Sequence, residues 1–389
     1  MKWLKRNNPI SKHWLSLVLG ALSVLSFAPF EFYWLTFPLL AALLHIWLPM
    51  SVKMAAINGF AYGMGLMGVG IFWLHVSISQ FGNLPLFVAM LMALVFAAFM
   101  ALFYALIAAV AAGLKNHLNL TRNQMLFLVY PSVWMLSEWL RSEMLTGFPW
   151  LSIGYAHTAT MLGNLATVGG VFLVSGITVL IAAALLLLVT AGKRQRIQAL
   201  LVICVSLLMA ALTAHLRWTE AVGDPLKVAI VQGNIEQSQK WLPQQLQPTL
   251  DLYRQLSFAV KSDVVVWPET AIPAFLHNVE GHFLQPLRNK LAGFNRQLVL
   301  GIPVWSDDKA VYYNSMISTG ASNDRYDKRH LVPFGEFMPF ADWLAPVLQW
   351  MQIPMSDFRA GSAEKPLLQV GDYQAGVSIC YEDAFGNES

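Results

Sequence analysis

Near the end of the chain lies Tyr373-Gln374-Ala375-Gly376-Val377-Ser378-Ile379-Cys380-Tyr381-Glu382-Asp383, which decides the fold expected for the second half of the sequence. Its first half is small and apolar, with two β-branched residues and no helical periodicity, which is typical of a buried strand. Its second half places the thiol of Cys380 directly before a tyrosine and two acids. Two interpretations fit: a core cysteine, the commoner role for a lone cysteine, or a nucleophile presented where a strand ends.

The composition divides the chain into two parts. Of its 389 residues 56% are hydrophobic and only 12% are charged, whereas soluble domains carry about 25% charged residues. Charges are sparse before residue 217 and ordinary afterwards, so we expect a membrane domain over residues 1–217 and an extracytoplasmic domain over residues 225–389. The net charge is +3 and no basic stripe interleaves with aromatic residues, which argues against a nucleic-acid partner.

The first part contains seven apolar segments. A membrane-spanning helix needs about 20 apolar residues, and the first two segments are short enough to form either two crossings or a hairpin that dips into the bilayer. Both arrangements return the chain to its starting side. The segments are Trp14–Ala28, Phe32–Leu48, Ala55–Val76, Leu84–Leu114, Met125–Leu140, Met161–Ala191 and Ile197–Leu216.

The basic residues between these segments predict the orientation. One set of loops holds ten lysines and arginines, and the opposite set holds only Arg141 and Arg217. Basic loops stay in the cytoplasm, so an odd number of crossings places everything after Leu216 outside, on the periplasmic face of a bacterial inner membrane. One sparse loop combines Glu138–Arg141 with Gly147–Trp150, a pattern that fits interfacial anchors and a lipid head-group site equally well.

The second part reads as a layered α/β domain, because predicted strands alternate with predicted helices. An apolar, nearly uncharged stretch over residues 340–355 fits either an arm resting on the bilayer or a buried helix. The predicted strands are Leu226–Gln232, Asp263–Glu269, Gln297–Trp305 and Tyr312–Thr319, and the predicted helices are Pro243–Lys261 and Phe283–Phe294.

Three residues at strand ends or in the loops that follow could supply chemistry: Glu269, Lys328 and Cys380. A carboxylate can act as base toward a thiol, and a lysine can stabilise a tetrahedral oxyanion. Any α/β domain contains some residues of these types, so the residue types alone leave the assignment open. We expect no metal, because Cys380 lacks a second thiol or histidine at ligand spacing.

Three blocks resemble the signature motifs of the nitrilase, or carbon–nitrogen hydrolase, superfamily with its Glu-Lys-Cys triad. They are Trp267–Thr270, Tyr326–Glu336 and Ser378–Asp383. The loop with Trp139-Leu140-Arg141 and Gly147–Trp150, the strand end Val231–Ile235 and the following Lys240-Trp241 further resemble the apolipoprotein N-acyltransferase family.

This resemblance implies an αββα sandwich for the second domain and a transfer through a thioester. Cys380 would be the nucleophile that takes an acyl chain from a phospholipid, usually phosphatidylethanolamine; Glu269 would be the base, and Lys328 would bind the oxyanion. The acceptor would be the α-amino group of the diacylglyceryl-cysteine at the amino terminus of an apolipoprotein, and no cofactor is implied. Supporting or substrate-binding roles would fall to Trp241, Glu336, Tyr381 and Glu382.

Members of that family continue well beyond the cysteine, whereas this sequence stops at Ser389. We therefore expect an α/β domain that is incomplete at its carboxyl end, and a 389-residue form whose own activity is in doubt. Two other functions fit parts of the pattern. A membrane-tethered amidase would use the same triad with water as acceptor, and a transporter with an accessory outer domain would require charges or broken helices at the midplane.

Overall fold

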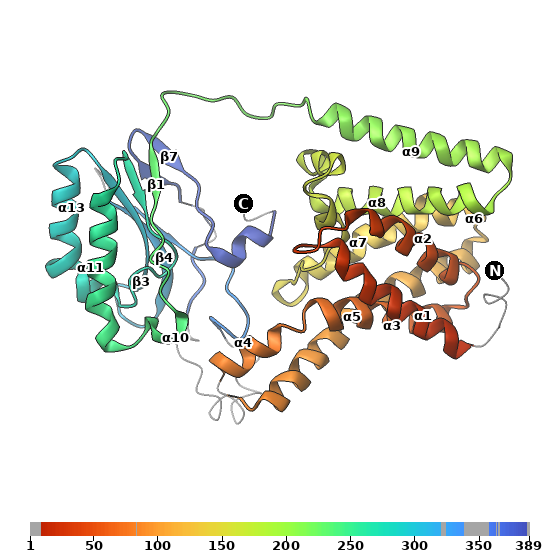
Figure 1. Ribbon diagram of the computed structural model, residues 1–389, viewed down its shortest axis with the longest axis horizontal. Coiled ribbons are helices and arrows are strands. Elements are labelled where there is room, and N and C mark those ends of the chain that lie inside the picture. Colours follow the sequence, from red (N-terminus) through yellow and green to blue (C-terminus); the bar gives the residue numbers. More distant parts are fainter. Residues whose placement is uncertain are drawn as a thin grey trace. The chain divides into compact units, whose positions relative to one another are not determined.

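A computed structural model of the chain describes residues 9–82, 84–319, 324–337, 358–362, 364 and 366–386. The chain divides into two units, Met1–Thr219 and Glu220–Ser389 (Figure 1). The apolar stretch over residues 340–355, interpreted above as an arm or a buried helix, lies outside the described residues.

The first unit is helical. Its core is a set of aromatic side chains, of which Trp47, Tyr62 and Trp134 are at most 1% exposed. Small residues allow the helices to approach closely: a Cβ on Gly65 would lie 2.0 Å from the carbonyl oxygen of Leu17 on the neighbouring helix. The helices are α1 Pro9–Ser23, α2 Thr36–Trp47, α3 Val52–Gly70, α4 Leu74–Phe81, α5 Leu86–Leu118, α6 Arg122–Gln124, α7 Tyr130–Glu143, α8 Ala166–Thr190 and α9 Lys193–Thr213.

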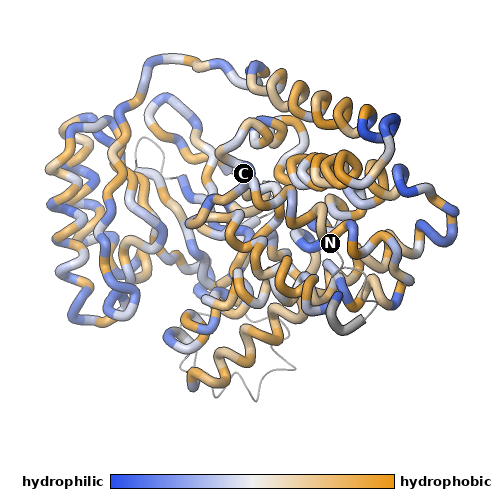
Figure 2. Tube along the Cα trace, turned by 45° about the vertical axis from the view of Figure 1, so that its right-hand side comes forward, coloured by the Kyte–Doolittle hydropathy of each residue, from blue (hydrophilic) through white to orange (hydrophobic). Residues whose placement is uncertain are grey.

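Fewer helices could cross a membrane than the seven apolar segments predict. Within the described residues, three helical stretches are long and apolar enough: Leu86–Leu118, Met161–Thr190 and Lys193–Thr213. The pair Val52–Gly70 and Leu74–Gln80, bent by 53°, would make a fourth. The first two segments form shorter apolar helices, Lys12–Ser26 and Tyr33–Trp47, and the number of crossings stays a prediction. Figure 2 shows these helices hydrophobic along most of their length, whereas those of the second unit alternate between hydrophobic and hydrophilic.

Glu138 and Arg141 are neither exposed anchors nor an open head-group site, because both side chains are at most 2% exposed. Glu138 accepts hydrogen bonds from the Trp134 indole and from the backbone N–H of Ile153, each 2.9 Å long. Arg141 donates to the backbone carbonyl of Phe148 at 2.9 Å and to the loop beyond it. The two charged residues therefore fold the loop back onto α7.

The second unit is built on a five-stranded sheet in the order β1-β2-β3-β4-β5, beside a two-stranded antiparallel sheet, β6-β7, in the portion described. Strands β1 to β3 run parallel and β3 to β5 antiparallel. The predicted strands at Gln297–Trp305 and Tyr312–Thr319 are confirmed, and so is a helix beginning at Pro243. The strands are β1 Val228–Ile230, β2 Val264–Val266, β3 Gln297–Trp305, β4 Tyr312–Thr319, β5 Arg325–Asp327, β6 Leu368–Val370 and β7 Tyr373–Ala375; the helices are α10 Gln237–Lys240, α11 Pro243–Ala259, α12 Leu276–Val279 and α13 Gln285–Ala292.

Alternation of side chains along the strands produces the layers. Val265 and Leu298 point to one face, where they pack against residues of α11 and α13. Val264 and Val299 point to the other face and pack against Leu368 of the small sheet. Helices, large sheet and small sheet thus form three layers of an αββα arrangement, and the described residues contain no helical layer beyond the small sheet (Figure 1).

The prediction of a buried strand running up to Cys380 is wrong in part. Strand β7 ends at Ala375 and is partly exposed, and a 3-10 helix begins at Cys380. The physical reason is local: the backbone N–H of Ile379, which a sheet partner would use, donates instead to the carboxylate of Glu382 at 2.7 Å. Cys380 therefore lies at the start of this 3-10 turn, in the left-handed region of backbone space at φ 54°.

Glu269 follows β2 and is held against β3. The backbone N–H of Trp267 donates to Val299 at 2.8 Å, and its buried indole donates to Ser257 at 2.9 Å. The chain then passes so close to Gly301 that a Cβ there would lie 2.6 Å from the Cα of Glu269. Glu269 can therefore occupy this position only because residue 301 has no side chain.

We expect Gly301→Ala to destabilise the second unit by about 1–3 kcal/mol, because the backbone of residues 268–270 must move away to admit the methyl group. A thermal unfolding scan of the full chain in detergent should show a lower transition temperature for this variant. Gly281→Ala is the matched control, since an added Cβ there meets nothing within 4 Å. An unchanged transition in Gly301→Ala would contradict the packing described.

Candidate active site

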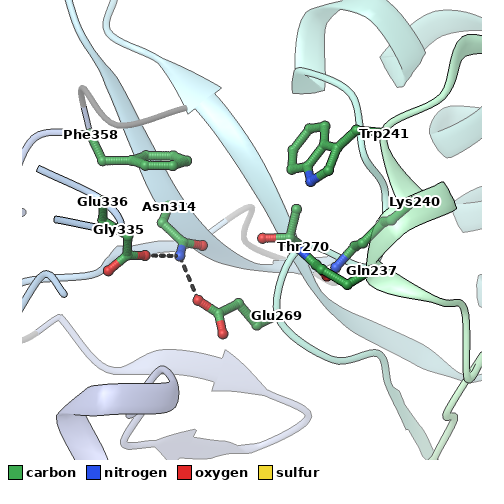
Figure 3. Close-up of a pocket in the computed structure, with 9 residues that line it drawn as sticks. All are labelled: Gln237, Lys240, Trp241, Glu269, Thr270, Asn314, Gly335, Glu336 and Phe358. Atoms are coloured by element: carbon green, nitrogen blue, oxygen red, sulfur yellow. Dashed lines mark hydrogen bonds between the residues drawn. The ribbon is translucent and has the colours of Figure 1, made fainter. Parts of the chain in front are cut away.

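A cavity of about 250 Å³ opens beside Glu269 in the second unit (Figure 3). Glu269, Asn314 and Glu336 lie close together in it, with Lys240 and Trp241 across the cavity. The full lining is Gln237, Lys240, Trp241, Glu269, Thr270, Asn314, Gly335, Glu336 and Phe358.

Lys328 holds the two carboxylates of this site together. Its side chain is 1% exposed, and its ammonium group lies 3.3 Å from Glu269 Oε1 and 2.9 Å from Glu336 Oε2. Burial is the largest single influence and lowers the pKa of Lys328. The charges of Glu269 and Glu336 together outweigh burial, so the pKa of Lys328 is raised on balance and the group stays charged.

Asn314 is a site residue that the sequence analysis missed. It lies on β4 and is 3% exposed. Its Nδ2 donates to Glu269 Oε1 at 2.6 Å and to Glu336 Oε1 at 2.8 Å, as the dashed lines in Figure 3 show. The available signal was an asparagine inside a predicted strand, because strands contain few asparagines.

Glu336 is fixed by its own loop as well as by Lys328. Its Oε2 accepts the backbone N–H of Val332 at 2.9 Å, while the backbone N–H of Glu336 donates to the carbonyl of Val332 at 2.9 Å. With Lys328 and Asn314 also donating to it, this carboxylate has little freedom to move. Glu269, 32% exposed, is the more accessible of the two carboxylates.

The exposed thiol of Cys380 lies within the electrostatic reach of both carboxylates. Partial desolvation is the largest cause that raises the pKa of Cys380, followed by the charge of Glu269 and a hydrogen bond with it. The charge of Lys328 lowers the pKa of Cys380, but the pKa remains raised on balance. The resting sulfur is therefore a protonated thiol beside a carboxylate that can take its proton.

Glu382 and Tyr381, which follow the nucleophile candidate, contact the protein. The carboxylate of Glu382 is fully buried and accepts hydrogen bonds from the Tyr326 hydroxyl at 2.8 Å and from the backbone N–H of Arg329 at 2.7 Å. Since it also accepts from Ile379, it ties the Cys380 loop to the loop that carries Lys328. The ring of Tyr381 packs edge-on against Phe385, with centroids 5.0 Å apart.

The structure thus brings Glu269, Lys328, Glu336 and Cys380 together, and Trp241 lines the cavity beside the two carboxylates. Tyr381 and Glu382 lie next to the nucleophile candidate, the latter inside the protein. Among the described residues, no group of three or more His, Cys, Asp or Glu side chains could hold a metal ion. The arrangement of base, cation and thiol is suited to acyl transfer through sulfur.

Comparison with known proteins covers both units. Residues 19–184 match the family described as apolipoprotein N-acyltransferase N-terminal domain, and residues 227–389 match the carbon-nitrogen hydrolase family. A curated apolipoprotein N-acyltransferase of Methylococcus capsulatus is 40% identical over 377 residues, which are 96% of this chain and 74% of that protein. Proteins of the same name from Pseudomonas syringae pv. tomato and Chromobacterium violaceum are 38% and 34% identical, covering 98% and 95% of this chain and 76% and 71% of their own lengths.

The raised pKa of Cys380 predicts that loss of the Glu269 charge makes the thiol easier to deprotonate, while loss of the base slows acyl transfer. In a Cys204→Ser background, the alkylation rate of Cys380 by iodoacetamide should rise with pH around a midpoint above the value of about 8.5 for free cysteine. Glu269→Gln should move that midpoint downward, because it removes a negative charge that disfavours the thiolate. The same variant should lose acyl transfer by about 100-fold or more, because it also removes the base.

Asp307→Asn serves as the control for this measurement, since it removes an exposed carboxylate of the same unit that lines neither cavity near Glu269. Its alkylation profile should coincide with that of the parent. A midpoint that rises or stays fixed in Glu269→Gln would show that the carboxylate does not face the sulfur.

Proposed function

The chain belongs to the apolipoprotein N-acyltransferase family, and we propose that Cys380 carries the acyl group which this acyltransferase moves from a phospholipid to an apolipoprotein. The observation that supports this role is the contact network of Glu269, Lys328, Asn314 and Glu336 next to a cysteine on an exposed turn. We further propose phosphatidylethanolamine as the acyl donor, the usual donor in the family that the sequence resembles.

In the first step, the carboxylate of Glu269 takes the proton of Cys380 as the sulfur attacks the ester carbonyl of the donor. The carbonyl oxygen becomes an oxyanion, and the ammonium of Lys328 stabilises this charge. When the tetrahedral intermediate collapses, Glu269 returns the proton to the departing glycerol oxygen. The products are a lysophospholipid and a thioester on Cys380.

In the second step, the α-amino group of the diacylglyceryl-cysteine at the acceptor's amino terminus attacks the thioester carbonyl. Glu269 accepts the proton that the amine loses, and the proton then passes to the departing sulfur. The C–S bond breaks as the amide C–N bond forms, which restores the free thiol. Lys328 stabilises the oxyanion here as well, so one set of groups serves both half-reactions.

Glu336 and Asn314 act by holding the reacting groups in place. Asn314 donates to both carboxylates, and Glu336 gives Lys328 a second negative partner. That partner keeps the lysine charged while Glu269 is protonated in the intermediate. Lys328 can then stabilise an oxyanion at the moment when its contact with Glu269 is weakest.

We also propose that the second unit lies on the periplasmic side of a bacterial inner membrane. The support is the concentration of lysine and arginine in alternate loops of the first unit, which keeps those loops in the cytoplasm. Both substrates of the reaction carry acyl chains. An enzyme held at the same bilayer surface therefore meets them at high local concentration.

The central experiment is to detect the acyl-enzyme. Incubation of the Cys204→Ser protein with phosphatidylethanolamine in mixed micelles, without acceptor, should add the mass of one acyl chain to the peptide containing Cys380 and release an equivalent amount of lysophospholipid. Neutral hydroxylamine should remove that mass, as expected of a thioester. Addition of a diacylglyceryl-cysteine peptide should transfer the chain to its amino terminus.

Cys380→Ser is the control, and it should acquire no hydroxylamine-sensitive acyl group. Release of free fatty acid without acylation of the peptide acceptor would instead support an amidase-type enzyme that uses water. Acylation of any residue other than Cys380 would contradict the proposed role of this thiol.

Sidedness is tested by single cysteines placed in a cysteine-free chain. Lys309→Cys, in an exposed turn of the second unit, should react with a membrane-impermeant maleimide added to intact spheroplasts. Arg194→Cys, near the start of α9, should react only after the membrane is permeabilised. The reverse pattern would place the second unit in the cytoplasm and overturn the proposed orientation.

A further inference from the structure

Lys240 occupies an unusual position beside Glu269. It ends the short helix α10, its side chain is half-buried, and it lines both the 250 Å³ cavity of the candidate active site and an adjoining cavity of about 400 Å³. Glu269 also lines both cavities. Figure 3 shows the ammonium end of Lys240 directed toward Gln237, across the cavity from Asn314 and Glu336.

The charges of the site are divided unequally. Lys328 makes an ion pair with each carboxylate, at 3.3 Å to Glu269 and 2.9 Å to Glu336. The ammonium of Lys240 makes no hydrogen bond and no ion pair with any residue in the described part of the chain. Lys328 thus contacts both carboxylates directly, whereas Lys240 is attracted by the charge of Glu269 but makes no ion pair with it.

An unpaired, half-buried ammonium group is costly unless a ligand supplies the missing partner. Burial lowers the pKa of Lys240, and the charge of Glu269 compensates for only part of this effect. Two further donors lie on the same side of the cavity, the side-chain amide of Gln237 and the indole of Trp241 (Figure 3). Together they form a concave surface with hydrogen-bond donors that an anion can fill.

The reaction proposed above brings one suitable anion to this cavity. A glycerophospholipid carries a phosphodiester only a few bonds from the ester carbonyl that the sulfur must attack. A group that holds the phosphate must therefore lie near the base, and Lys240 lines the same two cavities as Glu269. We propose that Lys240, with Gln237 beside it, binds the phosphodiester of the phospholipid donor and so places the donor's ester before Cys380; this subsite rests on the proposed function.

The proposal separates Lys240 from a residue that merely tunes Glu269. A phosphate-binding group should affect donors that carry phosphate and spare acyl donors that lack it. A group that acts through Glu269 should affect both kinds of donor equally, because both need the same base. The comparison of two donors therefore decides between the two roles.

The experiment measures single-turnover acylation of Cys380 in the Cys204→Ser background with two donors, phosphatidylethanolamine and the phosphate-free ester p-nitrophenyl palmitate, both in neutral detergent micelles. Lys240→Gln should weaken the apparent affinity for the phospholipid about tenfold or more, the loss expected when one charge-assisted hydrogen bond is removed. Its acylation by the phosphate-free ester should fall much less, so the ratio between the two donors should change about tenfold. Lys240→Arg, which keeps the charge, should recover most of the phospholipid reaction.

Lys261→Gln is the matched control, because Lys261 is an exposed lysine of the same unit that lines neither cavity. It should react with both donors as the parent does. An equal loss with both donors in Lys240→Gln would assign Lys240 to the support of Glu269 and overturn the subsite. No loss with either donor would overturn it as well.

Equilibrium binding provides a readout that does not depend on turnover. A diether phosphatidylethanolamine has no ester to transfer, and its affinity for the Cys380→Ala protein should fall about tenfold on adding Lys240→Gln. Free glycerophosphoethanolamine should compete for the site, whereas inorganic phosphate at equal concentration should compete less if the lipid head group is the ligand. If the diether lipid binds through Lys240 but no thioester forms, the proposed reaction fails and the subsite stands; if its affinity is unchanged in Lys240→Gln, the subsite fails.

Discussion

The second unit depends on the burial of one charge, the ammonium of Lys328. Removing a lysine from water is costly unless opposite charges and hydrogen-bond acceptors surround it, and here Glu269 and Glu336 do so at 3.3 and 2.9 Å. These partners come from different segments, one after β2 and one in the loop beyond β5. Because Lys328 lies in that same loop, satisfying the lysine forces the two segments to meet, and the meeting point is the candidate active site.

A second buried carboxylate extends this constraint to the nucleophile candidate. Glu382 binds the backbone of the loop next to Lys328 and, through Ile379, the backbone just before Cys380. One acid thus fixes both the lysine loop and the cysteine loop, although it lies inside the protein. The sulfur is consequently positioned by a group that need not touch either substrate, while a separate carboxylate, Glu269, faces it.

Much of this arrangement could be predicted from the sequence, because strands and their ends leave strong local signals. The limits of β3 and β4 were predicted from their apolar runs, and Glu269 and Lys328, assigned to one site, do lie in contact. Asn314 was missed because its partners are distant in sequence. The loop before Cys380 was taken for a strand because its composition is that of a strand, and the competing carboxylate of Glu382 lies three residues ahead.

In the first unit, less of the structure could be predicted from the sequence. Apolar composition located its helices, but fewer of them are both long and apolar enough to cross a membrane than apolar segments were counted. Glu138 and Arg141 illustrate the same limit. Their charges suggested residues at the membrane surface. Their hydrogen bonds instead show two buried residues that hold the following loop against α7.

The left-handed backbone of Cys380, at φ 54°, limits which atoms could ever replace its sulfur. Residues branched at Cβ are strongly disfavoured there, so threonine is excluded as an alternative nucleophile by the shape of the main chain, whatever its reactivity. Serine and alanine keep the unbranched Cβ of cysteine, and glycine would relax the turn. Any lineage or library that explores other nucleophiles at this position must therefore first rebuild the turn.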